Sequence, residues 1–256
     1  MNLKGGTGKT VTAINTAAIL ARDHAQRVLL VDADSQANLT EFVTGGSMPD
    51  GVTPGGLSDL LRGLTGFPIP ANIRNVSILW ADASLMALDI TAASTGGTAD
   101  PMALTEFLQT VQDKYDHCLI DCPPAFSAAA MAALIAADQV IIPMKVDAFG
   151  IRGMANLMEQ IRNMQRVNRG LEIGGVLPTM TYMDHKQELA EKELRTLLAS
   201  VGIRCFDHIR RSTMVNDSTF AQLPLIDSSP KSGACQDYRK FVAAMTGLEG
   251  GEHDGV

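Results

Sequence analysis

The chain has 256 residues, 46% of them hydrophobic, and a formal net charge of −7 at pH 7. Such a length and composition fit one globular domain, or at most two small ones, and exclude a disordered chain. The closest approach to a membrane span is residues 128–137, well short of the roughly 18 apolar residues that a span needs. The first residues have no secretory pattern, so we expect a cytoplasmic protein with no membrane partner.

The charge is unevenly distributed along the chain. Residues 1–149 hold 8 basic and 15 acidic side chains, a net of −7, whereas residues 150–240 hold 13 basic and 10 acidic, a net of +3. The remaining residues, 241–256, hold three acids and no base. The balance excludes a generic nucleic-acid coat, but it permits a DNA-facing surface in the second part of the chain.

The cysteines do not form a metal-binding pattern. The four are Cys118, Cys122, Cys205 and Cys235, and none forms a CxxC pair with another. This spacing argues against a metal or iron–sulfur site within one chain, and buried or free thiols are the simpler interpretation.

Apolar, β-rich runs alternate with helical patterns along the chain, which is typical of βαβ units and a mostly parallel sheet. The predicted strands, in chain order, are residues 27–32, 76–80, 117–121, 139–144 and 173–177. The predicted helices are residues 9–22, 151–164, 186–200 and 233–245, and the predicted loops are residues 44–56 and 94–101. We therefore expect an α/β fold with a twisted sheet flanked by helices on both faces, one domain over residues 1–246, and a disordered acidic tail over residues 247–256.

A glycine-rich loop at residues 4–10, KGGTGKT, precedes the first predicted helix. Its glycines let backbone N–H groups fold around phosphate oxygens, and the helix that follows adds the positive end of its dipole. Lys9 can reach the terminal phosphates, and the Thr10 hydroxyl can bind Mg²⁺. The residues expected to bind a nucleotide are Lys4, Gly5, Gly6, Thr7, Gly8, Lys9, Thr10 and Val11.

Two features set this loop apart from an ordinary phosphate-binding loop. Leu3 stands where the strict G-x-x-x-x-G-K-[ST] pattern has its first glycine. A loop of this kind also follows a buried strand, yet only Met1, Asn2 and Leu3 precede Lys4. The usual first strand is therefore missing, and we expect that the natural start lies upstream or that this chain is a truncated form.

The loop with its early lysine resembles that of the deviant Walker A ATPases, which include the ParA partition ATPases, MinD and nitrogenase iron protein. Other segments are similar to ParA in the same order and run almost end to end. They are LLVDADSQANLT (29–40), YDHCLIDCPPAFS (115–127), ADQVIIPMKVDAFGIRGMANLM (137–158), VLPTMTYMDHK (176–186), IRRSTMVNDS (209–218) and PLIDSSPKSGACQDYRKF (224–241).

The resemblance implies an ATPase mechanism. Two ATP-bound chains form a sandwich homodimer in which Lys4 reaches the nucleotide of the partner and Lys9 holds the phosphates of its own. Thr10 ligates Mg²⁺, and Asp121 supports the ion through water. Asp34 positions the attacking water, which gives the catalytic set Lys4, Lys9 and Asp34. Positioning and charge stabilisation of this kind dominate phosphoryl transfer.

The resemblance also implies DNA partition. An ATP-bound ParA dimer binds double-stranded DNA without sequence preference, and a ParB-like centromere-binding partner stimulates hydrolysis that is otherwise weak. Lys186 matches a basic residue of the family's DNA-binding surface, whereas the family's other arginine falls at Met214. Arg210 and Arg211 lie nearby as candidate substitutes, or they are ordinary solvated residues. The expected location is the cytoplasm, on the nucleoid.

Three alternatives stay open. A MinD-like ATPase that cycles on membranes needs a basic and apolar C-terminal helix, and the acidic tail here argues against it. A relative of nitrogenase iron protein needs cysteines at a dimer interface, where Cys122 in DCPP is the candidate. A regulator that binds nucleotide without hydrolysing it is compatible with Ser35, which stands where the family usually has proline.

Overall fold

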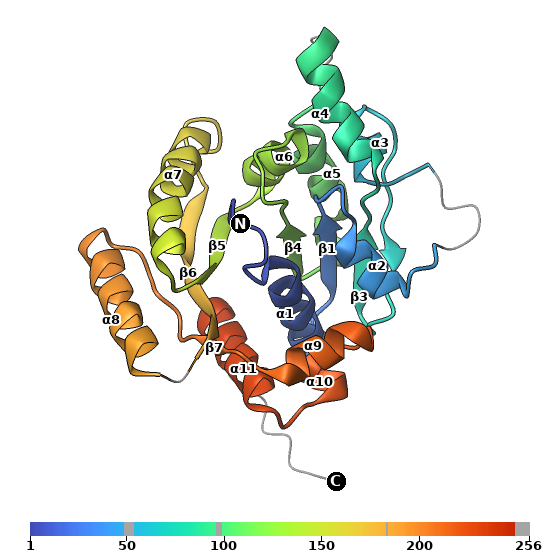
Figure 1. Cartoon of the computed structure of the whole chain (residues 1–256). Helices are drawn as coiled ribbons and strands as arrows, with labels where there is room; N and C mark the ends of the chain where they lie inside the picture. The colour runs from blue at the N-terminus through green and yellow to red at the C-terminus, as the bar shows by residue number, and fades with distance from the viewer. Residues whose placement is uncertain (49–53, 96–98, 183, 249–256) are drawn as a thin grey trace.

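The computed structural model describes residues 1–48, 54–95, 99–182 and 184–248 (Figure 1). The strands are β1 (Val28–Asp32), β2 (Ile69–Pro70), β3 (Val76–Leu79), β4 (His117–Asp121), β5 (Gln139–Lys145), β6 (Glu172–Thr181) and β7 (Ile209–Arg210). The first helices are α1 (Lys9–Asp23), α2 (Asn38–Thr44), α3 (Leu57–Leu61), α4 (Ser84–Thr95), α5 (Ala103–Val111), the 3₁₀ turn η1 (Gln112–Lys114) and α6 (Ala128–Ala136). The later helices are α7 (Ala148–Met164), α8 (His185–Ser200), α9 (Thr213–Phe220), α10 (Leu225–Ser228) and α11 (Gly233–Thr246).

The strands form two sheets rather than one. The first has the order β2-β3-β1-β4 and the second the order β5-β6-β7. All pairings are parallel except that of β2 with β3. This confirms the α/β class and the mostly parallel strands. The break between β4 and β5 is where the described residues 1–8 pass, in loop conformation, and the N-terminus lies between these two strands in Figure 1.

The first sheet is covered on both faces, as the apolar run over β1 predicts. All five residues of β1 are buried. Successive strand residues point to opposite faces, so Val28 and Leu30 join a core cluster with α1 and α11, whereas Leu29 and Val31 join a second cluster with α3, α5 and α6. Burial of each such side chain contributes roughly 1.5–3 kcal/mol.

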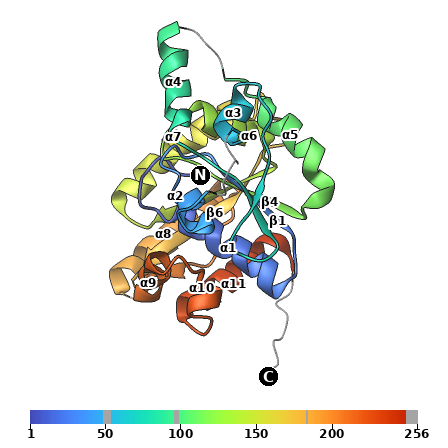
Figure 2. The ribbon, with the colours of Figure 1, turned by 90° about the vertical axis from the view of Figure 1, so that its right-hand side faces the viewer.

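A third cluster holds the second sheet against α7 and α8. Val140, Ile142 and Met144 of β5 pack there with Ile161 of α7 and Leu194 of α8. Figure 1 shows α7 and α8 beside β5 and β6, away from α1. Figure 2, turned by 90°, shows that α4 projects beyond the rest of the ribbon. The methionine stripe predicted for α7 serves core packing, since Met154 and Met158 belong to this cluster.

The predicted elements agree with the observed ones to within a few residues. The weak strand over residues 173–177 is longer than predicted, since β6 runs over ten residues. The predicted loop over residues 94–101 is wrong at its start, because α4 continues to Thr95. Residues 49–53 of the other predicted loop, 44–56, and residues 249–256 of the predicted tail, 247–256, lie outside the described residues. Within that tail, Gly247 ends α11 with φ of 74° and Leu248 packs against the first cluster.

Within the described residues, no helix is both long and apolar enough to cross a membrane.

Candidate nucleotide site

The phosphate-loop candidate lies at the N-terminus of α1, at the carboxyl ends of β1 and β4. Gly8 is the N-cap of α1 and has φ of 84°, and Gly6 has φ of 66°; side chains with a Cβ rarely adopt this left-handed conformation. Gly5 and Gly6 are exposed, and a Cβ placed on either would meet no atom within 4 Å. The loop therefore has open space around its glycines and a helix N-terminus behind them, which together suit an anion.

Contacts from the second sheet fix the base of the loop. The Thr179 hydroxyl of β6 donates a hydrogen bond of 2.8 Å to the carbonyl of Thr7, which is buried. The Asn2 amide donates to the carbonyl of Pro143 in β5 at 2.8 Å, and its oxygen accepts from the Lys4 N–H at 2.9 Å. The loop thus links the two sheets, and its backbone is held before any ligand binds.

The first helical turn carries the side chains predicted to hold phosphate and Mg²⁺. The Thr10 hydroxyl donates a 2.6 Å hydrogen bond to Oδ2 of Asp121, the last residue of β4. Burial lowers the pKa of Lys9, while the nearby carboxylates of Asp121 and Asp34 act in the opposite direction. Lys9 Nζ makes a long 3.4 Å contact to the Lys4 carbonyl. Val11 is half-buried against the first core cluster, so only its backbone is suited to a ligand.

Asp121 is buried, and its carboxyl is poorly stabilised as a charge. Burial raises its pKa to about 7, and the charge of Asp32 adds to this, while the Thr10 hydroxyl and Lys9 oppose it. A divalent cation nearby would favour the ionised carboxylate. Hydroxyl and carboxylate oxygens are the ligands that Mg²⁺ prefers, and one or two carboxylates with substrate phosphates are its usual protein setting. The residues present therefore fit a magnesium ion beside a bound phosphate.

Asp32 and Asp34 have different roles at the end of β1. Asp32 is fully buried and accepts hydrogen bonds from the Thr40 N–H, the Thr40 hydroxyl and the Asp34 N–H at 2.9, 2.8 and 3.1 Å. Asp34 is half-buried and accepts from the Gln36 N–H at 3.0 Å. Asp32 thus fixes the turn, as a strand-end acid should, and leaves Asp34 as the acid with access to solvent near Lys9.

Lys4 contacts a residue that sequence reasoning did not single out. Its Nζ lies 2.8 Å and 3.1 Å from the two carboxylate oxygens of Asp147, which follows β5. The two side chains are 38% and 40% exposed, so the pair is accessible to solvent. The sequence does contain a signal that could have identified Asp147. Like Asp32 and Asp121, it is an acid at the end of a predicted parallel strand.

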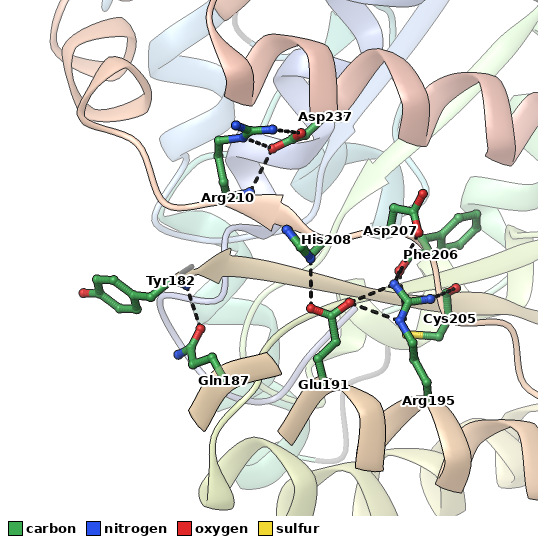
Figure 3. Close-up of polar contacts among 10 residues, drawn as sticks. All are labelled: Tyr182, Gln187, Glu191, Arg195, Cys205, Phe206, Asp207, His208, Arg210 and Asp237. Atoms are coloured by element: carbon green, nitrogen blue, oxygen red, sulfur yellow. Dashed lines mark hydrogen bonds and ion pairs between the residues drawn. The ribbon is translucent and has the colours of Figure 1, made fainter. Parts of the chain in front are cut away.

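The three candidate DNA-binding residues are not equivalent. Arg210 forms an ion pair with Asp237 of α11 through Nε at 2.7 Å, and its backbone N–H donates to the same carboxylate (Figure 3). Arg211 instead stacks on the ring of Tyr182, 5.0 Å from its centroid, and its guanidinium contacts the Tyr182 hydroxyl. Lys186 is exposed in the first turn of α8.

Tyr182 connects Arg211 to the start of α8. The backbone N–H of Tyr182 donates a 2.7 Å hydrogen bond to Gln187, the residue after Lys186 (Figure 3). Tyr182 thus places Arg211 near the start of α8, where Lys186 lies, whereas the charge of Arg210 is compensated by Asp237. In the same view, Glu191 of α8 accepts a hydrogen bond from Arg195 at 2.8 Å and contacts His208 at 2.9 Å, which connects α8 to the segment before β7.

A glycine loop that opens a helix, its lysine and threonine, and an acid at the end of a neighbouring parallel strand define the class of P-loop NTPases. A protein-family model described as an AAA domain matches residues 1–173. The chromosome-partitioning ATPase Soj of Treponema pallidum is 29% identical over 259 residues, covering 98% of this chain and 96% of that protein. The chromosome partitioning protein ParA of Caulobacter vibrioides is 30% identical over 255 residues, covering 97% and 92%. This chain belongs to the ParA family of P-loop proteins.

Solved structures support the fold alone. Apo McdA of Cyanothece has a TM-score of 0.81 at 22% identity and covers 96% of each chain. Cobyrinic acid a,c-diamide synthase of Mycobacterium smegmatis, with a bound ATP analogue and magnesium, has a TM-score of 0.76 at 24% identity and covers 98% of this chain and 96% of that one. The cell division ATPase MinD of Pyrococcus furiosus has a TM-score of 0.74 at 23% identity and covers 96% of each chain.

Proposed function

We propose that this protein is a DNA-partition ATPase of the ParA type, with residues 1–246 acting as one ATPase unit in the cytoplasm, on the nucleoid. The observation that carries the proposal is the convergence of Lys4, Lys9, Asp34 and the Thr10–Asp121 pair on one glycine loop. The relatives named for chromosome partitioning cover nearly all of the chain, which supports the same assignment.

The proposed substrate is ATP with Mg²⁺. The N–H groups at the start of α1 hold phosphate oxygens, and Lys9 neutralises the terminal phosphates. Thr10 binds the ion directly, and Asp121 holds it through water. The ion supplies charge neutralisation at the phosphates. This assignment is supported by the raised pKa of Asp121, since the ionised form needs a cation nearby.

Hydrolysis requires a water molecule held in line with the terminal phosphate. Asp34 is the proposed residue for this task, because it lies near Lys9 and its carboxylate is accessible, whereas the carboxylate of Asp32 is engaged by Thr40. The Asp34 backbone N–H is fixed by Asp32, which orients the turn before substrate binds. Ser35 follows Asp34 in this turn, and weak basal turnover is expected until a partner orders it.

Dimer formation gives Lys4 its role. In the nucleotide-free chain Lys4 is paired with Asp147. In the proposed ATP sandwich dimer Lys4 leaves that carboxylate and contacts the phosphates of the partner's nucleotide. Two half-exposed side chains form a pair worth only about 0–1 kcal/mol, so this exchange is energetically small.

The dimer is proposed to bind double-stranded DNA without sequence preference through the surface of Lys186 and Arg211. Doubling a small basic surface raises the number of phosphate contacts and therefore the affinity. A ParB-like centromere-binding protein is the proposed partner, and its contact with the dimer stimulates hydrolysis and releases DNA.

ATP-dependent retention of DNA tests this function. The protein is mixed with a duplex of random sequence and with ATP, ADP, a non-hydrolysable ATP analogue or no nucleotide, and retention is followed by gel shift and light scattering. We expect retention and a dimer with ATP and the analogue, and neither with ADP. A monomer that ignores DNA in every nucleotide state would contradict the proposal, as would binding to anionic vesicles in place of DNA.

A further inference from the structure

Tyr182 is an exposed aromatic residue that the nucleotide site does not use. The chain has three tyrosines. Tyr115 and Tyr238 pack against core clusters, whereas Tyr182, directly after β6, is 47% exposed. In Figure 3 its ring points away from the other labelled side chains. The ring therefore presents an apolar, polarisable face to solvent, and such a face can bind a flat ligand.

Two contacts hold Tyr182 in place. Its backbone N–H donates a hydrogen bond of 2.7 Å to the side-chain oxygen of Gln187. The guanidinium of Arg211 lies over the ring, 5.0 Å from its centroid, and contacts the hydroxyl. A cation in this position is attracted by the electrons of the ring and restricts its rotation. The orientation of the ring is thus set before a ligand arrives, which lowers the entropy cost of binding on its open face.

Two cations belong to the surroundings of this ring. Arg211 touches it, and Lys186 is exposed and adjacent in sequence to the glutamine that binds the Tyr182 backbone. The neighbouring acids are Asp184 and Glu188, and Asp184 is engaged as the N-cap of α8, where it accepts a backbone hydrogen bond of 2.9 Å. The N-terminus of α8 itself carries a positive partial charge. The ring therefore lies among groups that attract phosphates.

A DNA duplex covers the faces of its bases by stacking them on one another, whereas a single strand can place the face of a base on a protein ring. Stacking on aromatic rings beside cations is a general physical basis for binding single strands without sequence preference. We propose that Tyr182 is a stacking platform for an unpaired base of single-stranded DNA, with Lys186 and Arg211 contacting the flanking phosphates. The proposal rests on the proposed function for its class of ligand, DNA, and adds that this surface takes unpaired bases as well as duplex phosphates.

Phe220 shows that exposure of a ring is not sufficient for such a platform. It is 91% exposed at the last position of α9. That helix carries the acid Asp217 and no basic residue, and its C-terminus has a negative partial charge. A base stacked there would bring its phosphates to a helix end that repels them. Phe220 is therefore the matched aromatic control for Tyr182.

The test compares a single strand with a duplex on the whole chain. The probes are fluorescent oligothymidylate of about 16 nucleotides and a random-sequence duplex of the same length, and binding is followed by anisotropy with the non-hydrolysable ATP analogue and without nucleotide. The variants are Tyr182→Ala, Tyr182→Phe and Phe220→Ala. Alanine at position 182 keeps the backbone N–H that binds Gln187, so the start of α8 should remain folded, which thermal unfolding checks.

Loss of the ring should act on single strands alone. Tyr182→Ala is expected to weaken binding of the single strand by at least about fivefold and binding of the duplex by less than about twofold. Tyr182→Phe, which keeps the ring, and Phe220→Ala should stay within about twofold of the parent on both probes. An unchanged single-strand affinity in Tyr182→Ala, an equal loss on the duplex, or an equal loss in Phe220→Ala would overturn the proposal.

The duplex probe separates this proposal from the proposed function. If the duplex is not bound and single-strand binding depends on Tyr182, the proposed function fails and the stacking platform stands. If the duplex is bound with ATP and the single-strand affinity ignores Tyr182, the platform fails and the proposed function stands. A chain that binds neither probe would overturn both.

Photochemical cross-linking keeps the test decisive if a variant fails to fold, because it uses the unaltered chain. Oligothymidylate with one 5-iodouracil is bound and irradiated, and the adduct is located by peptide mapping. We expect the adduct on Tyr182; a main adduct on Phe220 or on another segment would refute the platform. Oligouridylate of the same length is the competitor, and RNA that binds more than about tenfold tighter than the DNA strand would overturn DNA as the ligand.

Discussion

The charged side chains of the nucleotide loop are shielded from solvent, whereas those of Lys186 and Arg211 are exposed to it. At the loop, Asp121 is buried and the pKa of Lys9 is lowered by burial, so each side chain depends on its neighbours. At the surface, Lys186 and Arg211 are exposed and water screens them. Electrostatic interactions are far stronger in the first setting than in the second. Removal of a single charge should therefore have large, specific effects at the loop and small, graded effects at the surface.

The largest effect is expected at Asp34, in hydrolysis. Asp34→Ala removes the proposed water-positioning carboxylate and should lower the rate of ATP hydrolysis by about 10²–10⁴-fold, the usual contribution of such a group. ATP binding should change little, since Lys9, Thr10 and the helix N-terminus remain. Phosphate release in a single turnover measures the hydrolysis rate, and nucleotide titration measures ATP affinity. Normal turnover in this variant would move the role to another residue and leave Asp34 as a turn acid.

Lys9 should show the next largest effect, in nucleotide affinity. Lys9→Ala leaves bound phosphates without a partner in a site where burial already lowers the pKa of that lysine, so the loss should be at least about 30-fold. Titration with a fluorescent ATP analogue measures it. Lys114→Ala, on the exposed turn η1, removes a lysine of equal charge elsewhere and should leave affinity unchanged. Equal losses in both variants would mean that long-range charge, not this site, holds the nucleotide.

Asp121 links the loop to the pH dependence of stability. Its pKa is about 7 in the fold against a usual 3.8, so its contribution to stability is complete below about pH 4 and is lost as the pH rises through 7. Asp121→Asn should therefore stabilise the nucleotide-free protein at pH 8, by roughly 2–4 kcal/mol, and have little effect at pH 4. Urea unfolding at both values measures this, with the exposed Asp113→Asn as the control. A variant less stable than the parent at pH 8 would show that the carboxylate is well stabilised without a cation.

Sequence reasoning reached furthest where the candidate residues are adjacent in the chain or end a predicted strand. The loop at residues 4–10 could be found because its glycines, lysine and threonine are adjacent, and Asp121 because it ends an apolar strand. The sequence predicted a twisted sheet of mostly parallel strands but did not show that these strands would form two sheets. The Lys4–Asp147 pair was missed because it joins residues 143 positions apart. Helices as short as α2, α9 and α10 show too few turns for periodicity to reveal them.

The surface could be predicted only as a set of candidates. Arg210 and Arg211 are adjacent in sequence, and nothing in their order shows that one pairs with Asp237 and the other stacks on Tyr182. The partner of each arginine is set by a distant segment: Asp237 belongs to α11, and Tyr182 follows β6. Two arginines at neighbouring positions thus have different interaction partners, and only the three-dimensional structure distinguishes them.

The Lys4–Asp147 pair is intermediate in exposure between the buried charges of the nucleotide loop and the exposed charges of Lys186 and Arg211. Asp147→Asn removes the charge that holds Lys4 in the nucleotide-free chain. An exposed pair of at most about 1 kcal/mol corresponds to a factor of about five, and two pairs are released per dimer, so the constant for the ATP-dependent dimer should rise by up to about 25-fold. Sedimentation at several ATP concentrations measures the dimer constant. Lys4→Ala should remove the dimer and spare ATP binding by the monomer. A dimer that weakens in Asp147→Asn would place the carboxylate in the dimer contact rather than against it.

The smallest effects should appear on DNA. Lys186→Ala and Arg211→Ala should each lower the slope of log affinity against log salt by about one, uniformly across sequences, because each loses one phosphate contact. Arg210→Ala should leave the slope unchanged, because its guanidinium is engaged by Asp237. It should instead lower Tm, since it leaves the buried Asp237 carboxylate without its partner. If Arg210→Ala changes the salt slope as much as the other two, Arg210 must exchange Asp237 for DNA, and the distinction between compensated and available charge on this surface fails.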